Sequence, residues 1–173
     1  MLTTSFKPKT IELHISGKIF SDDKKLNEQL VGLNIFVFAD RKLVGQAFTD
    51  SNGHYKMSFI PASQKSFEFF VTSIGIDTSF LKSFTTFESD VMTYDFGFPK
   101  SYDKKLEQVI CTKCNKKDKV YPIIYGWEQK RTIIILNGDT TYNNIVDKKY
   151  YAGTCMNSLL SPHYYCDRDK IKF

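Results

Sequence analysis

Thr49-Asp50-Ser51-Asn52-Gly53-His54-Tyr55 is the stretch of this chain that says most about its fold. The Asp50 carboxylate can accept hydrogen bonds from the backbone amides of a tight turn, and the Asn52-Gly53 pair suits the positive φ angles that such turns require. Strand-like runs lie on both sides, from Leu43 to Thr49 and from Tyr55 to Pro61. The stretch therefore predicts a tight turn between two β-strands.

Further runs rich in β-branched and aromatic residues predict additional strands. They are Ile11–Phe20, Leu33–Ala39, Ser66–Ser73, Phe80–Phe87 and Val91–Phe98. Asp40-Arg41-Lys42 predicts a short hairpin connection, and Gly17 predicts a bulge or a close backbone approach. The charged segment Ser21–Gln29 is expected to be a loop with at most one helical turn. About seven short strands without a long helix predict a mainly β fold, a Greek-key-type β-sandwich.

Several motifs in this part of the chain resemble those of a known family. In chain order they are Ile15-Ser16-Gly17-Lys18-Ile19, Leu30-Val31-Gly32-Leu33-Asn34-Ile35, Gly45–Tyr55, Phe59-Ile60-Pro61 and Ser73-Ile74-Gly75-Ile76. Their order is similar to that in carboxypeptidase regulatory-like domains, over about residues 11 to 98. The resemblance implies a transthyretin-like β-sandwich without catalytic residues. Members of that family are often attached to secreted or cell-envelope proteins.

Cys111-Thr112-Lys113-Cys114 places two thiols on one tight turn, and Cys155 and Cys166 follow later in the chain. Between them lie strand-like runs, Lys119–Gly126, Arg131–Leu136 and Lys149–Gly153. Four soft ligands on short strands predict a structural Zn²⁺ site, because so small a unit buries too little apolar surface without metal. The chain is therefore predicted to have two domains, residues 1–99 and 100–173, joined by a charged linker at Lys100–Glu107.

The second part also resembles a family of small bacterial zinc-ribbon proteins. The resemblance rests on the Cys111–Cys114 turn, Tyr121–Gly126, Ala152–Cys155 and Ser161–Cys166. That pattern expects a second Cys-x-x-Cys, where this chain has Cys166-Asp167-Arg168-Asp169. The predicted ligands are Cys111, Cys114, Cys155 and Cys166, with Asp169 as the alternative fourth ligand. Cys155 is preferred for its softer sulfur, whereas Asp169 has the correct spacing.

Other interpretations of this part of the chain stay open. A Cys-x-x-Cys pair can be redox-active, and a degenerate ribbon can lose its metal. His163 could be a ligand or an aromatic neighbour of Tyr164, and Trp127 could be core or a partner anchor. The segment Thr140–Asn144 is expected to be a surface loop, and His14 and His54 are expected to be structural.

The charge is unevenly distributed. Residues 1–100 contain 11 Lys or Arg and 11 Asp or Glu, whereas residues 101–173 contain 13 and 8. The net charge of +5 therefore lies in the cysteine-bearing part. This makes a nucleic-acid binder, acting through a basic zinc-ribbon unit, the alternative to a protein-binding module.

No phosphate-binding loop, serine nucleophile motif or His-Glu-x-x-His motif occurs in the sequence. We therefore expect a non-catalytic binding or accessory protein that mediates protein–protein interaction, and a zinc-dependent hydrolase is the less favoured reading. No apolar run approaches the ~20 residues of a transmembrane helix. The N-terminal sequence does not resemble a signal peptide, which predicts a cytoplasmic protein if Met1 is the native start. A cell-envelope or secreted location is the alternative, if a signal peptide has been removed.

Overall fold

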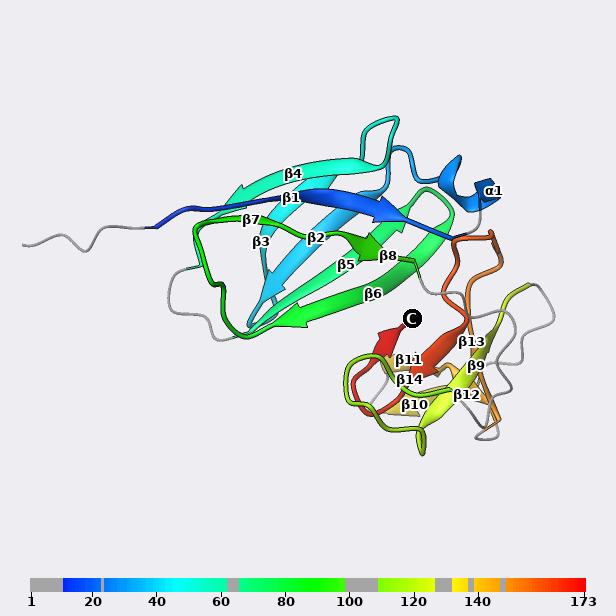
Figure 1. The fold of residues 1–173 in the computed structure, drawn as a ribbon. Helices are drawn as coiled ribbons and strands as arrows, with labels where there is room; N and C mark the ends of the chain where they lie inside the picture. The colour runs from blue at the N-terminus through cyan, green and yellow to red at the C-terminus, as the bar shows by residue number, and fades with distance from the viewer. Residues whose placement is uncertain are drawn as a thin grey trace, which may run out of the picture.

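The computed structural model describes residues 11–22, 24–61, 66–98, 109–126, 132–136, 139–146 and 149–173. Within these ranges the fold is mainly β, as predicted, with 15 strands and one short helix, α1 (Lys24–Asn27) (Figure 1). The predicted linker Lys100–Glu107, the predicted domain boundary at residue 99 and Trp127 lie outside the described residues.

One sheet of the sandwich is built around β1 (Leu13–Phe20). The strand β4 (His54–Phe59) pairs antiparallel with one edge of β1, and β7 (Val91–Thr93) and β8 (Phe96–Gly97) pair parallel with the other. The last predicted strand is thus interrupted between β7 and β8.

Gly17 explains the interruption. A Cβ at Gly17 would lie 1.8 Å from the Tyr94 carbonyl oxygen, so only glycine leaves room for the backbone at this point. Tyr94 donates its N–H to the Ser16 carbonyl at 2.8 Å, and the Tyr55 hydroxyl donates to the Tyr94 carbonyl at 2.7 Å. The prediction of a close backbone approach at Gly17 is confirmed.

The second sheet has the order β3 (Lys42–Phe48), β2 (Asn34–Ala39), β5 (Phe67–Ser73), β6 (Ile76–Phe84), all antiparallel. β6 begins earlier than the predicted Phe80, because the chain reverses directly after β5 at Ile74-Gly75, where Gly75 has a φ of 75°. β2 and β3 form the predicted hairpin, joined by Asp40 and Arg41.

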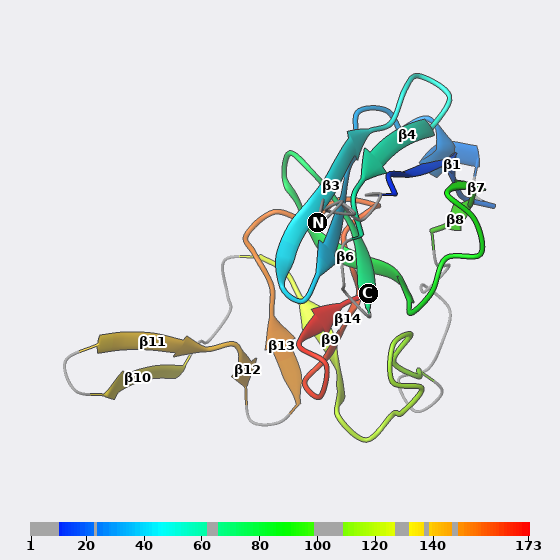
Figure 2. The same ribbon diagram turned by 90° about the vertical axis from the view of Figure 1, so that its left-hand side faces the viewer.

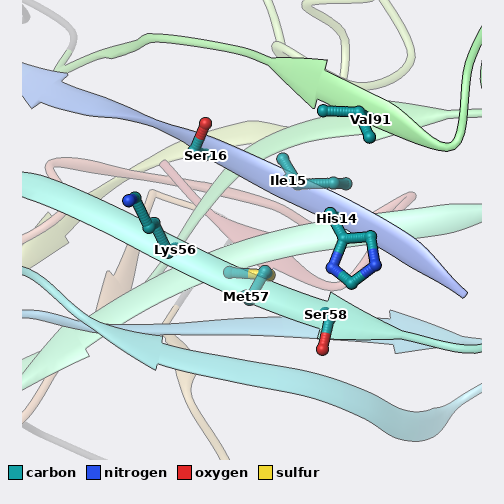
Figure 3. Close-up of a pocket in the computed structure, with 7 residues that line it drawn as sticks. All are labelled: His14, Ile15, Ser16, Lys56, Met57, Ser58 and Val91. Carbon is teal, nitrogen blue, oxygen red and sulfur yellow. The ribbon is translucent and has the colours of Figure 1, made fainter.

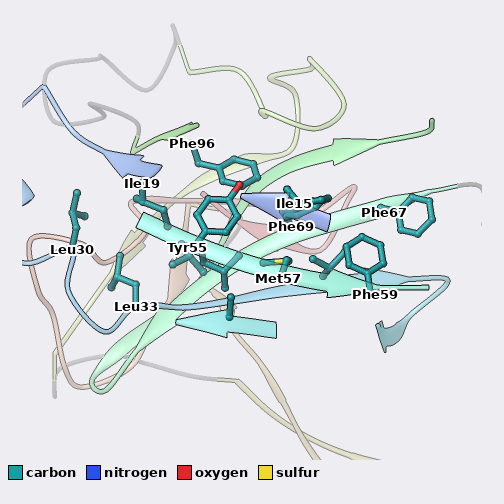
Figure 4. Packing of buried hydrophobic residues seen from close by; sticks show 14 of the residues in the cluster. Ile15, Ile19, Leu30, Leu33, Tyr55, Met57, Phe59, Phe67, Phe69 and Phe96 are labelled. Carbon is teal, nitrogen blue, oxygen red and sulfur yellow. The ribbon is translucent and has the colours of Figure 1, made fainter. Parts of the chain in front are cut away.

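The facing sides of the two sheets form one apolar core (Figure 4). Its members alternate with exposed residues along β4 and with half-buried residues along β2 and β5, as the period of two predicts. Phe69, Ile19, Ile35, Val37 and Val71 are at most 1% exposed. None of the described residues in this core is a predicted metal ligand.

The turn at Thr49–Tyr55 has the predicted geometry. The Asp50 carboxylate accepts hydrogen bonds from the amides of Asn52 at 2.8 Å and His54 at 2.9 Å, and Gly53 has a φ of 78°. The buried Thr49 hydroxyl donates to the Leu30 carbonyl at 2.5 Å and accepts from the Leu33 amide at 2.9 Å. The turn therefore also fixes the segment that leads into β2.

The C-terminal part contains a five-stranded sheet and a separate hairpin. The sheet order is β12 (Ile145–Val146), β13 (Tyr150–Ala152), β9 (Val120–Ile124), β14 (Tyr164–Cys166), β15 (Ile171–Lys172). The hairpin of β10 (Thr132–Leu136) and β11 (Asp139–Asn143) stands apart from the sheet (Figure 2). All of the predicted surface loop Thr140–Asn144 except Asn144 lies in β11, so the expectation of a loop there is wrong.

The C-terminal part packs against the sandwich near β6. Phe80 of β6 is in one buried cluster with Cys111, Cys166 and Ile171. Lys172 of β15 forms an ion pair with Asp77 of β6 at 2.8 Å. Leu160 is buried in the sandwich core. The two parts thus share apolar surface as well as ion pairs.

Candidate metal centre

The first half of the candidate centre is the turn Cys111–Cys114. The Asn115 amide donates to the Cys111 carbonyl at 3.0 Å, and the Cys111 amide donates to the Lys116 carbonyl at 3.0 Å. Asn115 has a φ of 55°, which reverses the chain directly after the second cysteine. The Lys113 amide donates to the Cys111 sulfur at 3.4 Å, so the backbone holds this sulfur inside the turn.

The second half is the turn that connects β14 to β15, Cys166–Asp169. Lys170 follows with a φ of 56°, close to the value at Asn115 in the first turn. Each turn therefore places two side chains three residues apart and ends on a residue in the left-handed region. Asn commonly adopts this conformation, whereas Lys does so at some cost in strain. The two turns are similar although their sequences differ.

The two turns bring four ligand atoms together. One atom each from Cys111, Cys114, Cys166 and Asp169 lies within 4.8 Å of the other three. The Cys114 and Cys166 sulfurs are 3.9 Å apart, and Oδ2 of Asp169 is 3.2 Å from the sulfurs of Cys111 and Cys166. Tetrahedral zinc places two sulfurs about 3.8 Å apart, and a sulfur and a carboxylate oxygen about 3.5 Å apart. The cluster is therefore compatible with a metal site.

Cys155 is not part of this cluster. Its side chain is exposed, and Asp169 supplies the fourth ligand atom in the structure. β9 explains the separation, because Cys166 is opposite Val120 at its beginning, whereas Ala152 is opposite Ile124 at its end. Four residues along a strand correspond to about 13 Å. The structure thus places Asp169, the alternative fourth ligand, and not Cys155 beside the other three predicted ligands.

His163 is also outside the group of four. It is half-buried directly before β14, and burial lowers its pKa below the ordinary value. Its backbone amide donates to the Phe173 carbonyl at 3.1 Å, and its carbonyl accepts from the Ile123 amide at 2.7 Å. The backbone of His163 thus helps to place β14 beside β9.

The electrostatics of the cluster favour one charged carboxylate among neutral thiols. Burial raises the pKa of the Cys111 thiol and of the Cys166 thiol. Burial also opposes ionisation of Asp169, but hydrogen bonds from the thiols of Cys114, Cys111 and Cys166 outweigh it and lower the pKa of this carboxyl. Metal ions bind thiolates, so binding here would release protons.

Two aromatic side chains of the sandwich complete the surroundings, and sequence reasoning did not assign them to the site. Phe80 and Phe70 pack in the same cluster as Cys111, Cys114 and Cys166. Lys113 forms an ion pair with Glu68 and lies 5.9 Å from the centre of the Phe80 ring. The sequence could have indicated them, because each is an apolar residue at a strand position that alternation predicts to face solvent.

A second candidate site is a shallow groove on the β1–β4 sheet (Figure 3). It measures about 410 Å³ and is lined by cross-strand neighbours, His14 with Ser58 and Ser16 with Lys56, together with Ile15, Met57 and Val91. These seven described residues include no thiol or carboxylate that could join His14 in metal binding or acid–base catalysis. The cysteine cluster is therefore the better-supported functional site.

No known protein family and no curated protein matches this chain. Among solved structures, a 9R-lipoxygenase from Cyanothece PCC8801 is similar to 63% of this chain, with 16% sequence identity and a TM-score of 0.35. The similar part is 21% of that lipoxygenase. A similarity this distant carries no conclusion about this chain's activity.

None of the helices in the described part of the chain has the length and apolar character needed to cross a membrane.

Proposed function

We propose that this chain is a non-catalytic binding module, in which a β-sandwich of the carboxypeptidase regulatory-like type carries a C-terminal unit held by a structural Zn²⁺. The observation that carries the metal part is the cluster of Cys111, Cys114, Cys166 and Asp169, whose ligand atoms lie within 4.8 Å of one another. The sandwich part is supported by the Thr49–Tyr55 turn and the close approach at Gly17, which lie within the motifs that resemble that family.

Zinc suits the donor set better than other common metals. Three sulfurs and one carboxylate oxygen form a soft, four-coordinate site, whereas Mg²⁺ and Ca²⁺ require six or more oxygen ligands. The intervals of 3.2 and 3.9 Å between ligand atoms are close to those of a tetrahedral zinc site. A site with three thiols also requires a reducing compartment, which supports a cytoplasmic location.

A structural role is favoured because the protein supplies all four ligands. A catalytic zinc site keeps an open position for water and places a general base beside it. Here the Cys111 and Cys166 side chains are buried, and Glu68, the acid next to Lys113, is held in an ion pair. The geometry thus supports a metal that fixes the C-terminal unit, and a hydrolase is not supported.

The test is the metal content of the purified full-length protein and of two matched variants, measured by elemental analysis. We expect about one zinc per chain in the unmodified protein and in Cys155→Ser, and little or none in Asp169→Asn. Zinc lost from Cys155→Ser but kept in Asp169→Asn would reverse the ligand assignment. A protein without zinc after purification under reducing conditions, which also fails to take up added Zn²⁺, would refute the metal site.

Nucleic-acid binding is the second candidate, favoured by exposed lysines after the first turn. Lys116, Lys117 and Lys119 are all exposed, and the excess of basic residues lies in residues 101–173. Binding to a labelled oligonucleotide that weakens steeply with salt would support this candidate. If the oligonucleotide does not bind, or binds with an affinity that does not change with salt, the protein-binding role remains the proposed function.

A further inference from the structure

The outer face of the β3–β2–β5–β6 sheet carries aromatic residues where a sandwich normally presents polar ones. Phe36, Phe70 and Phe80 are direct cross-strand neighbours, and Phe38 lies two residues after Phe36 on the same face. The ring centres of Phe38 and Phe70 are 5.8 Å apart, and those of Phe70 and Phe80 are 5.5 Å apart. A row of rings therefore runs across this face.

Among the described residues, the C-terminal unit packs against the Phe70–Phe80 end of this row. Phe80 and Phe70 pack into the cluster around the cysteines, whereas Phe36 and Phe38 belong to neither buried cluster. Leu43, opposite Phe38, is 53% exposed, and Phe48 on the same strand is 63% exposed. We call Phe36, Phe38, Leu43 and Phe48 the outer apolar face.

The outer apolar face directly continues the interface with the C-terminal unit. Glu68 is the cross-strand neighbour of Phe38, and it forms the ion pair with Lys113 of the first cysteine turn. The Cys111–Cys114 turn therefore lies beside Phe38, at one side of the outer apolar face. A molecule bound on this face would contact both the sandwich and the metal-bearing unit.

Beyond Phe38 and Leu43 the face ends at a strained turn, which carries one acidic and one basic side chain. Asp40 and Arg41 join β2 to β3 with φ angles of 50° and 66°. A turn with two positive φ angles normally has glycine at its second position, because other residues are strained there. Arg41 and the next residue, Lys42, are exposed. Arg41 therefore adopts a strained backbone conformation that glycine would adopt at no cost.

We propose that the outer apolar face binds an acidic segment of a partner protein, with apolar side chains packing on Phe38 and Leu43 and carboxylates pairing with Arg41 and Lys42. This inference rests on the proposed role as a protein-binding module and names the chemistry of the partner. At the hairpin end of the face, Arg41 and Lys42 outnumber the one acid there, Asp40, whereas Glu68 and Lys113 beside Phe38 neutralise each other. Charge complementarity therefore favours an acidic occupant.

Two other occupants fit the observations less well. In a symmetric dimer through this face the same patch meets itself, so the basic border would lie close to its own copy. Single-stranded nucleic acid needs free ring faces for base stacking. Here the rings pack edge-to-face, at interplanar angles of 64° for Phe36–Phe38, 84° for Phe38–Phe70 and 72° for Phe70–Phe80, and so occupy one another's faces.

The test uses the full chain to select from a displayed library of random peptides, followed by fluorescence anisotropy with the enriched peptides. We expect acid-rich peptides with apolar residues. Phe38→Ser and Leu43→Ser should each weaken their binding at least ~10-fold, as expected for central contacts. Arg41→Gly should weaken it about 3- to 10-fold while raising the thermal midpoint, because glycine relieves the turn. Val91→Ser, 65% exposed on the other sheet, is the control and should change nothing.

Several results would overturn this assignment: enrichment of basic peptides, no enrichment at all, or affinities unchanged in Phe38→Ser and Leu43→Ser. Concentration-dependent dimerisation that Leu43→Ser abolishes would assign the face to a second copy, and tight binding of oligo(dT) lost in the same variant would assign it to nucleic acid. Zinc is measured in every sample, so a missing metal with intact peptide binding refutes the metal site alone, and bound zinc without peptide binding refutes the docking face alone.

Discussion

The sandwich and the C-terminal unit differ in how much apolar surface they bury. Among the described residues, the main cluster contains 18 buried apolar residues, all but Leu160 from the sandwich, whereas the cluster around the candidate metal centre contains 7, two of which are cysteines. Apolar burial contributes roughly in proportion to area, so the larger cluster can stabilise its sheets unaided. The smaller one contains candidate metal ligands and packs against Phe70 and Phe80 of the sandwich.

The largest effect that separates the two regions should follow loss of the metal. Cys111→Ser removes a proposed ligand, and a structural Zn²⁺ site can contribute on the order of 10 kcal/mol to folding. We expect zinc content near zero and loss of order in the C-terminal unit, while the β signal of the sandwich persists in circular dichroism. Trp127, the single tryptophan of the chain, lies in the C-terminal part of the sequence, so its fluorescence provides a separate readout.

Cys155→Ser is the matched control, since it removes an exposed cysteine outside the cluster and should leave both signals unchanged. A cooperative loss of the whole β signal in Cys111→Ser would show that the sandwich also depends on the metal, and the contrast between the regions would disappear.

The reverse experiment weakens the sandwich. Phe69 is fully buried and packs against Phe84 and Phe96, at ring distances of 5.4 and 5.3 Å. Phe69→Ala should lower the free energy of unfolding by about 3 to 5 kcal/mol through lost burial and the cavity left behind. Denaturant titration measures this, and zinc content should stay at the level of the unmodified protein. A loss of zinc before the sandwich unfolds would mean that the packing of the sandwich, including Phe70 and Phe80 beside the cysteines, controls the metal site.

A smaller loss of stability should follow from a substitution in the turn Thr49–Tyr55. Thr49→Val removes the hydroxyl that donates to the Leu30 carbonyl and accepts from the Leu33 amide, and leaves these buried groups unsatisfied. The expected cost is about 1 to 3 kcal/mol in the free energy of unfolding. Thr49→Ser keeps the hydroxyl and should recover most of the stability. Equal losses in both variants would assign the effect to the missing methyl group.

The smallest expected effect is the pH dependence carried by Asp50. Its pKa is lowered, first by the hydrogen bond from the His54 amide and then by that from Asn52. The native state therefore favours the charged carboxylate, and this contribution is lost as the pH falls through the unfolded pKa near ~4 and then the folded one. Asp50→Asn should unfold with a weaker dependence on pH below about 5. Identical pH profiles would exclude Asp50 as a contributor.

The sandwich was largely predictable because its signals are local. The period of two in Tyr55–Phe59 and the turn residues Asp50 and Gly53 each determine geometry within a few positions, and the structure has them as expected. The start of β6 was missed because apolar and polar residues alternate only weakly in Ile76–Ser79. The pairing with β5 decides the strand conformation of this segment.

The candidate centre was less predictable because its ligands are far apart in sequence. The turn spacing identified Cys111, Cys114 and Cys166 and kept Asp169 as an alternative, but only the sheet register shows that Cys155 lies at the far end of β9. The contribution of Phe70 and Phe80 depends on how the two parts pack, which no local pattern encodes.

The separation between the two turns also affects the order in which the protein forms during synthesis. All strands of the sandwich precede residue 98, so a growing chain can fold this part first, as domains generally do. Cys111 and Cys114 then emerge before Cys166 and Asp169 exist. During that interval the nascent chain exposes a reactive dithiol. Its capture by an oxidant or by the wrong metal, rather than instability of the finished fold, would be the first hazard in making this protein.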